Sequence, residues 1–200
     1  MPSTPGMLIA FEGLDQSGKQ TQAEAVRHDI TSRSIPARLL SFPDYATPIG
    51  AELHRALHGE REYPPDVMQL LYVANRYEAR QDLQASLAAG TTIICDRYAA
   101  SSVAYGEAQG LDPEWLTEIQ KFLPRADLTI LLDIAPDTAV RRKARGRDRY
   151  ERDLALLSRV RESYHRQAAV GGWIVVDGEQ SPSEVTAVVL NALATRLVLR

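Results

Sequence analysis

The chain has 200 residues, of which 44% are hydrophobic and 24% are charged, and its net charge is −3. This is enough apolar material for one sizeable core, so we expect a single domain over residues 1–200. The net charge gives no general case for nucleic-acid binding, and no apolar segment approaches the roughly 20 residues of a membrane span. The one cysteine, Cys95, excludes an intrachain disulfide. The first residues lack the basic and apolar regions of a signal peptide, so we expect a cytoplasmic protein.

Short apolar runs alternate with longer helical patterns along the chain, which is typical of a parallel α/β sheet. We predict strands at about 7–12, 37–42, 91–96, 128–133 and 173–177. We predict helices at about 18–33, 47–58, 65–89, 98–109, 112–123, 136–145, 149–170 and 182–198. The strand runs are apolar throughout rather than alternating. Helices should therefore cover both faces of a five-stranded parallel sheet.

The first predicted strand runs directly into a glycine-rich turn, and a helix follows. The turn matches G-x-x-x-x-G-K, in which backbone N–H groups surround a phosphate and the lysine, here Lys19, reaches the outer oxygens. An incidental glycine-rich turn is the alternative, but the strand before it and the helix after it favour a phosphate loop. We assign ATP binding at this loop to Gly13, Leu14, Asp15, Gln16, Ser17, Gly18, Lys19, Gln20 and Thr21.

One position of the phosphate loop departs from the usual pattern. The residue after the lysine is Gln20, where Ser or Thr normally directs a hydroxyl to Mg²⁺. Thr21 points elsewhere on the helix and is not an obvious replacement. We therefore expect Mg²⁺ to be held through water or by carboxylates.

The second and third predicted strands also end in candidate site residues. Phe42-Pro43-Asp44-Tyr45 follows the second strand, and Asp96-Arg97-Tyr98 closes the third. Ligands of parallel α/β sheets bind beyond the carboxyl ends of the strands. Both motifs should therefore lie near the phosphate loop.

A segment rich in arginine occupies residues 141–152. So many neighbouring cations repel one another unless a polyanion meets them. A solvated basic helix face or an RNA-binding patch is the alternative explanation. Beside a phosphate loop, arginines that neutralise a transferring phosphoryl group explain the segment better, and we interpret it as a lid.

Other classes of P-loop protein fit the chain less well. A GTPase should carry an Asn-Lys-x-Asp motif that reads guanine, and the chain has none. An ATP-driven motor or transporter would be larger or would carry further machinery. A phosphotransferase is the class that the residues favour.

The motifs, taken in order, resemble those of the thymidylate kinase family from about Leu8 to Asp177. They are Phe11-Glu12-Gly13-Leu14-Asp15 with Gly18-Lys19, Phe42-Pro43, Tyr72 with Arg76, Asp96-Arg97-Tyr98 with Ser101 and Tyr105, and Arg149-Tyr150-Glu151. A non-basic loop residue, Gln16, together with an arginine-rich lid resembles the bacterial branch, which keeps its catalytic arginines in the lid. The resemblance implies a P-loop kinase fold that transfers a phosphoryl group from MgATP to dTMP.

The resemblance also implies the contacts of the acceptor nucleotide. Asp15 would contact the sugar 3′-hydroxyl, Tyr72 would stack on thymine, and Arg76 would donate to a base carbonyl. Arg97 would bridge the acceptor and donor phosphates, and Tyr105 would crowd a ribose 2′-hydroxyl. The other implied acceptor contacts are Phe42, Pro43, Tyr45, Ser101, Ser102 and Glu151.

The metal and catalytic groups follow from the same resemblance. Asp96 should bind Mg²⁺ through water, with Asp15 and Glu151 nearby, and Arg142 would contact ATP and stack on adenine. The residues with implied catalytic roles are Lys19, Arg97, Asp15, Arg145 and Arg149. No general base is needed, because the attacking phosphate oxygen is already ionised near neutral pH.

The resulting prediction is ATP-dependent phosphorylation of dTMP to dTDP with Mg²⁺ as cofactor, and the resemblance implies a homodimer. A related nucleoside monophosphate or deoxynucleoside kinase is the alternative among enzymes. A catalytically weak nucleotide-binding protein, with Gln20 as the sign of decay, is the alternative outside the enzymes. We expect no nucleic-acid or membrane partner.

Overall fold

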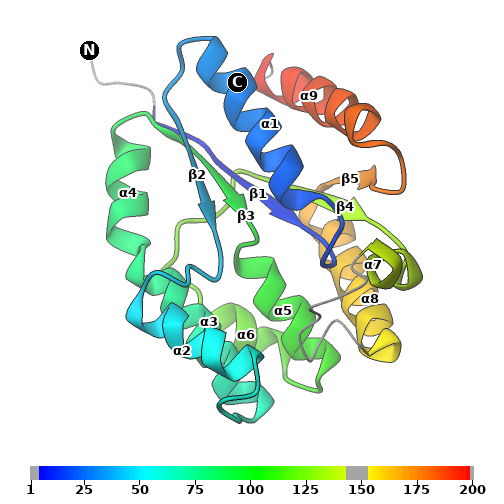
Figure 1. Cartoon of the computed structure of the whole chain (residues 1–200). Coiled ribbons are helices and arrows are strands. Elements are labelled where there is room, and N and C mark those ends of the chain that lie inside the picture. The colour runs from blue at the N-terminus through cyan, green and yellow to red at the C-terminus, as the bar shows by residue number, and fades with distance from the viewer. Residues whose placement is uncertain (1–4, 143–152, 199–200) are drawn as a thin grey trace.

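The computed structural model describes residues 5–142 and 153–198, and these contain a parallel β-sheet of five strands. The strands stand in the order β2-β3-β1-β4-β5 (Figure 1). They are β1 (Leu8–Glu12), β2 (Ala37–Ser41), β3 (Thr92–Asp96), β4 (Leu128–Asp133) and β5 (Ile174–Asp177). Each strand begins and ends within about one residue of its predicted bounds. The predicted five-stranded parallel sheet is therefore confirmed.

Helices connect these strands throughout the described part of the chain. They are α1 (Lys19–Ser32), α2 (Pro48–Leu57), α3 (Pro65–Glu78), α4 (Arg80–Ala88), α5 (Ala99–Ala108), α6 (Pro113–Glu118), α7 (Pro136–Arg142), α8 (Leu154–Gly171) and α9 (Pro182–Val198). Proline begins α2, α3, α6, α7 and α9, because the first N–H of a helix has no partner within the helix. No helix among the described residues is long and apolar enough to cross a membrane.

Two helix predictions were wrong in their extent. The run predicted at about 65–89 is two helices, because Ala79 N–H bonds to the carbonyl of Arg76, three residues back, at 3.2 Å. This tighter turn ends α3, and α4 begins at Arg80. No glycine or proline marks the break, so the pattern suggested a continuous helix. In addition, α6 ends at Glu118, earlier than predicted.

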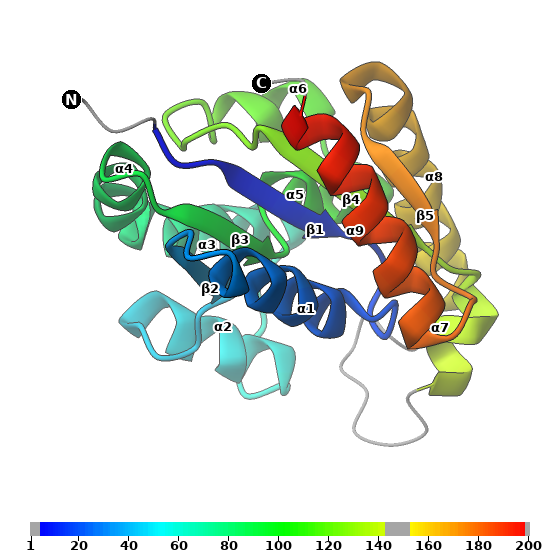
Figure 2. The same cartoon turned by 90° about the horizontal axis from the view of Figure 1, so that it is seen from above.

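Different helices cover the two faces of the sheet (Figures 1 and 2). On one face Ile9 and Phe11 of β1 share a buried cluster with Val26 of α1 and Val189 of α9. The intervening residues of β1, including Leu8, point to the other face, where α4, α5 and α8 pack. Both faces are thus buried, as the uninterrupted apolar runs predicted.

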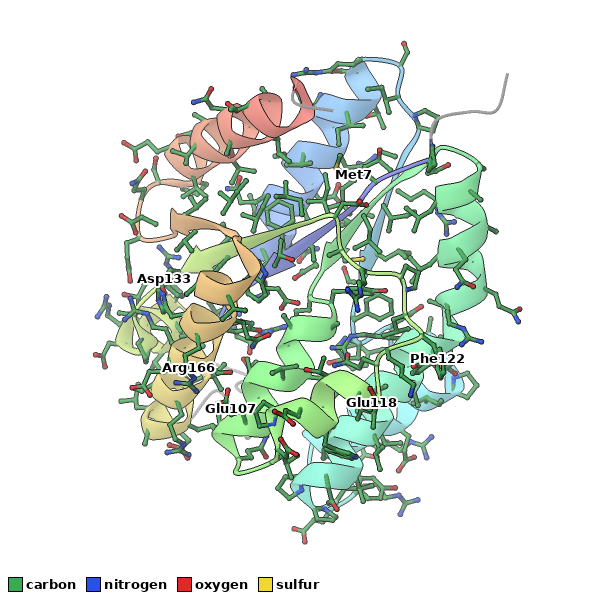
Figure 3. The ribbon with its side chains drawn as sticks, turned by 180° about the vertical axis from the view of Figure 1, so that it is seen from behind. Met7, Glu107, Glu118, Phe122, Asp133 and Arg166 are labelled. Atoms are coloured by element: carbon green, nitrogen blue, oxygen red, sulfur yellow. The ribbon has the colours of Figure 1, made fainter. Side chains whose placement is uncertain are left out.

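The order of the strands determines where a ligand can bind. β1 lies between β3 and β4, so the loop that follows β1 sits in the middle of the carboxyl edge of the sheet. α5 and α8 flank this edge, and an ion pair between Glu107 and Arg166 at 2.8 Å joins them (Figure 3). Residues from three strand ends and from α3 and α5 therefore converge on one crevice.

Candidate active site

The phosphate loop has a backbone that depends on its glycines. Gly13 has a φ of 139° and Gly18 a φ of 92°, values that other residues rarely adopt. A Cβ atom on Gly13 would also lie 2.4 Å from the carbonyl oxygen of Leu132, so no larger side chain fits there. Gly18 directly precedes α1, and the N–H groups and dipole at that helix end favour a bound anion.

Lys19 lies buried against the same loop. Its Nζ donates a hydrogen bond to the carbonyl oxygen of Leu14 at 2.7 Å. Burial, followed by the positive charge of Arg97, lowers the pKa of Lys19 to about 8, although nearby carboxylates act in the opposite direction. The ammonium group therefore stands at the phosphate loop, where we predicted it, and its charge is sensitive to mildly alkaline pH.

Arg97, Asp15 and Tyr105 form a polar cluster beside the loop. Nη2 of Arg97 donates to Oδ1 of Asp15 at 2.7 Å, and the hydroxyl of Tyr105 donates to Oδ2 at 3.1 Å. Burial raises the pKa of Asp15, but the charges of Arg97 and Lys19 outweigh it and hold that pKa below its usual range. Burial also raises the pKa of Tyr105 well above its ordinary value. At neutral pH, Asp15 is therefore ionised and Tyr105 keeps its proton.

A buried carboxylate supports the strained turn at Arg97. Arg97 has a φ of 64°, in the left-handed region that few residues other than glycine occupy. The following N–H, of Tyr98, donates to Oε1 of Glu12 at 2.9 Å, while Oε2 accepts from Ser101 at 2.6 Å and from Tyr164 at 3.2 Å. We did not predict these supporting roles of Glu12 and Tyr164. The position of Glu12 at the end of β1 was an available signal, whereas Tyr164 offered none.

The opposite end of the crevice contains another arginine, Arg76, and this one is buried. Nη1 of Arg76 donates to Oγ of Ser102 at 2.8 Å and lies 3.4 Å from Oε1 of Gln120. Nε of Arg76 is buried and has no hydrogen-bond partner among the described residues. Burial lowers the pKa of Arg76 from its ordinary value. A guanidinium with an unused donor, one helical turn from Tyr72, suits a carbonyl oxygen on a planar ring.

Both ends belong to a single cavity. Its lining includes the predicted contacts Asp15, Phe42, Pro43, Tyr45, Tyr72, Arg76, Arg97, Ser101, Ser102 and Tyr105. Leu57 and Gln69 complete the lining and were not predicted. Gln69 precedes Tyr72 by three residues and Arg76 by seven, so helical spacing could have indicated it. Leu57, a plain apolar residue, gave no such signal.

The loop after β2 is fixed to α3 by Asn75, another residue that sequence reasoning missed. Oδ1 of Asn75 accepts from the N–H of Asp44 at 2.8 Å, and its Nδ2 donates to the carbonyl of Asp44 at 3.1 Å. The Phe42–Pro43 peptide bond that leads into this loop is cis. Tyr45 is 46% exposed, so the loop presents it at the mouth of the cavity.

Asp96 is the described residue that best fits a hydrated Mg²⁺. Its Oδ1 is buried and has no hydrogen-bond partner among the described residues. This oxygen is therefore available to accept a hydrogen bond from a water molecule bound to the cation. Asp15 is engaged by Arg97 and Tyr105, and the third predicted metal residue, Glu151, lies outside the described residues. Within residues 5–142 and 153–198, no three His, Cys, Asp or Glu side chains are grouped to hold a metal ion.

On the donor side, Arg142 joins two loops. Its Nη1 donates to the carbonyl of Gln16 at 3.2 Å, and its Nη2 donates to the carbonyl of Gly178 at 2.9 Å. Arg142 therefore lies against the phosphate loop, and its contact with ATP stays a prediction. Arg145 and Arg149, the other predicted lid residues, lie outside the described residues.

Comparisons with known proteins identify the family to which the chain is similar. The model of the thymidylate kinase family matches residues 11–189. The thymidylate kinase of Dictyostelium discoideum is 33% identical over 182 residues, covering 90% of this chain and 82% of that protein. The thymidylate kinase of Schizosaccharomyces pombe is 38% identical over 161 residues, covering 80% and 76%. A solved structure of thymidylate kinase from Candida albicans matches with a TM-score of 0.81 at 30% identity, over 96% of this chain and 92% of that one. The fold is thus that of a P-loop kinase, and the chain belongs to the thymidylate kinase family.

Proposed function

We propose that the protein phosphorylates dTMP to dTDP with ATP as the phosphoryl donor. The observation that carries this proposal is the single cavity with two chemically different ends. Arg97, beside the phosphate loop, offers a cation to a phosphate, while Tyr72 and Arg76 offer a ring face and a donor to a pyrimidine. Tyr105 lines the cavity and donates to Asp15, which suits a deoxyribose between the two ends.

The protein forms no covalent bond with the transferred phosphoryl group. An oxygen of the dTMP phosphate attacks the γ-phosphorus of ATP, and the bond from that phosphorus to the β–γ bridging oxygen breaks, leaving ADP. The attacking oxygen is already ionised near neutral pH, so no side chain has to remove a proton. Lys19 and Arg97 neutralise phosphate charge from fixed positions, which is the main catalytic contribution in such sites.

Mg²⁺, when bound, would supply positive charge that offsets the negative charge of the ATP phosphates. Asp96 would hold it through water, because its buried Oδ1 lacks a hydrogen-bond partner among the described residues. Gln20 offers no hydroxyl where the phosphate loop usually has one. The side chains of Gln20 and Thr21 are exposed on the first turn of α1.

Three finer features belong to the same proposal. The loop residue Gln16 is not basic, so Arg145 and Arg149 of the segment 141–152 would supply the catalytic arginines, as in the bacterial branch. The relatives named above are eukaryotic, so this feature rests on the residues of the chain alone. The homodimer and the cytoplasmic location that the resemblance implies are also proposals.

The test uses the purified protein, MgATP labelled at the γ-phosphate, and dTMP. We expect the label to appear in a product that co-migrates with dTDP, and Lys19→Ala to abolish the transfer while its circular dichroism stays that of the wild type. Labelling of thymidine but not of dTMP would instead indicate a nucleoside kinase. Binding of ATP without any transfer would indicate a nucleotide-binding protein, and either result contradicts the proposal.

A further inference from the structure

Gln69 is a buried amide that the described fold leaves unsatisfied. It lies on α3, one turn before Tyr72, and is 1% exposed. Neither its Nε2 nor its Oε1 has a hydrogen-bond partner among the described residues. The side chain nevertheless lines the acceptor cavity together with Tyr72 and Arg76.

A purely structural role explains this side chain poorly. A buried amide without partners costs stability, whereas an apolar side chain of similar size would pack at no such cost. Other buried amides of the chain are satisfied: Gln22, for example, donates to the carbonyl of Pro182 at 3.0 Å and accepts from Thr186 at 2.8 Å. We therefore expect a ligand in the cavity to form the missing hydrogen bonds with the amide of Gln69.

The contacts on α5 place Gln69 relative to Arg76. Arg76 bonds to Ser102, while Gln69 packs against Gly106, one helical turn further along α5. A Cβ atom on Gly106 would lie 3.3 Å from Cγ of Gln69. The guanidinium of Arg76 and the amide of Gln69 thus lie about one helical turn apart along the interface between α3 and α5. An arginine can only donate hydrogen bonds, whereas an amide both donates and accepts.

The donors and the acceptor of these two side chains complement the three neighbouring hydrogen-bonding groups on one edge of thymine. That edge presents the O4 acceptor, the N3–H donor and the O2 acceptor. We propose that Gln69 is a specificity-determining residue, whose Oε1 accepts from N3–H and whose Nε2 donates to O2, while Arg76 donates to O4. Cytosine presents an amino group in place of O4 and an acceptor at N3. The amino group of cytosine would thus face Arg76, which is also a donor, and N3 of cytosine would face Oε1 of Gln69, which is also an acceptor. The site should therefore bind cytosine poorly.

This inference rests on the proposed function and is tested by the choice of acceptor. Gln69→Met keeps the length of the side chain and removes both hydrogen-bonding atoms. We expect kcat/KM for dTMP to fall about tenfold, mainly through KM, because the contact is already made when the substrate binds. dUMP shares the same edge atoms and should lose the same factor. kcat/KM for dCMP should not fall, so the preference for dTMP over dCMP narrows about tenfold.

Gln22→Met is the matched control, since it removes a buried amide that lies between α1 and α9. Gln22→Met should leave the ratio of kcat/KM for dTMP to kcat/KM for dCMP unchanged, whatever its effect on stability. If Gln69→Met does not fold, Gln69→Ala tests the same ratio with less demand on packing. Equal losses for dTMP and dCMP in a folded Gln69 variant would show a structural role and overturn the inference. A wild-type enzyme without activity on dTMP would overturn the proposed function instead, so the two failures are distinguishable.

Discussion

At the scale of single residues, the charged groups in the site differ in how they are compensated. The side chains of Arg97 and Asp15 are 14% and 32% exposed, and their contact at 2.7 Å offsets the cost of partly burying both charges. An acceptor phosphate that binds Arg97 therefore shares that guanidinium with Asp15. Lys19 has no carboxylate partner within hydrogen-bonding distance among the described residues and bonds only to a carbonyl, which is why burial lowers its pKa.

The lowered pKa of Lys19 predicts a pH dependence. The free enzyme keeps the lysine charged below about pH 8 and loses that charge as the pH rises through this value. kcat/KM for ATP, which reports the free enzyme, should therefore decline above about pH 8 at saturating Mg²⁺. Bound phosphates raise the pKa of the lysine, so kcat should stay level to higher pH. A kcat/KM that remains constant up to about pH 9.5 would contradict this assignment.

At the scale of the elements, α5 organises the acceptor side of the site. One face of this helix carries Ser102 and Tyr105 into the cavity, and Gly106 lets α6 approach closely. The position of the side chains that we propose to read the base therefore depends on how α3, α5 and α6 pack together.

Gly106→Ala should destabilise this packing. The added Cβ would lie 2.5 Å from Cδ1 of Leu116, a fully buried side chain, so the packing around Leu116 would have to shift. We expect the free energy of unfolding to fall by about 1–3 kcal/mol in urea titrations. Leu116→Ala removes the clashing atoms, so the double variant should lose less than the sum of the two single losses. Strict additivity would show that the contact is not the cause.

The segment 141–152 gives a second prediction at this scale, derived from the sequence because Arg145 and Arg149 lie outside the described residues. If these arginines contact the transferring phosphoryl group mainly in the transition state, Arg145→Ala and Arg149→Ala should each lower kcat more than they raise KM for dTMP. Loss of one such arginine can cost about 10³-fold, and sharing between the two should make each single effect smaller. Arg125→Ala, an exposed arginine outside the site, should leave kcat unchanged. Effects confined to KM would mark the segment as a solvated basic face.

At the scale of the whole molecule, the sequence predicted what local patterns encode. Apolar runs placed every strand, and glycine spacing placed the phosphate loop. The break between α3 and α4 at Ala79 was not predicted, because neither glycine nor proline marks it. The bond from Tyr164 to Glu12 joins residues 152 positions apart, and only the folded chain brings them together. The roles of such residues depend on tertiary packing, which a single sequence does not display.

Gln69 illustrates the same limit inside the cavity itself. Its spacing relative to Tyr72 and Arg76 is visible in the sequence, yet spacing alone equally allows a surface glutamine. Burial and the lack of hydrogen-bond partners among the described residues distinguish it, and both come from the structure. The motifs thus predicted residues that line the cavity, and packing added Gln69, which we propose reads the base.

The most direct test of the central claim is the acceptor profile of the wild-type protein. kcat/KM should be measured with saturating MgATP for dTMP, UMP, dAMP, dGMP and thymidine. We expect dTMP to be the best acceptor, because Tyr72 and Arg76 suit a pyrimidine with a 4-carbonyl, Tyr105 suits deoxyribose, and Arg97 requires a phosphate. A preference for a purine nucleotide or for thymidine would contradict the account.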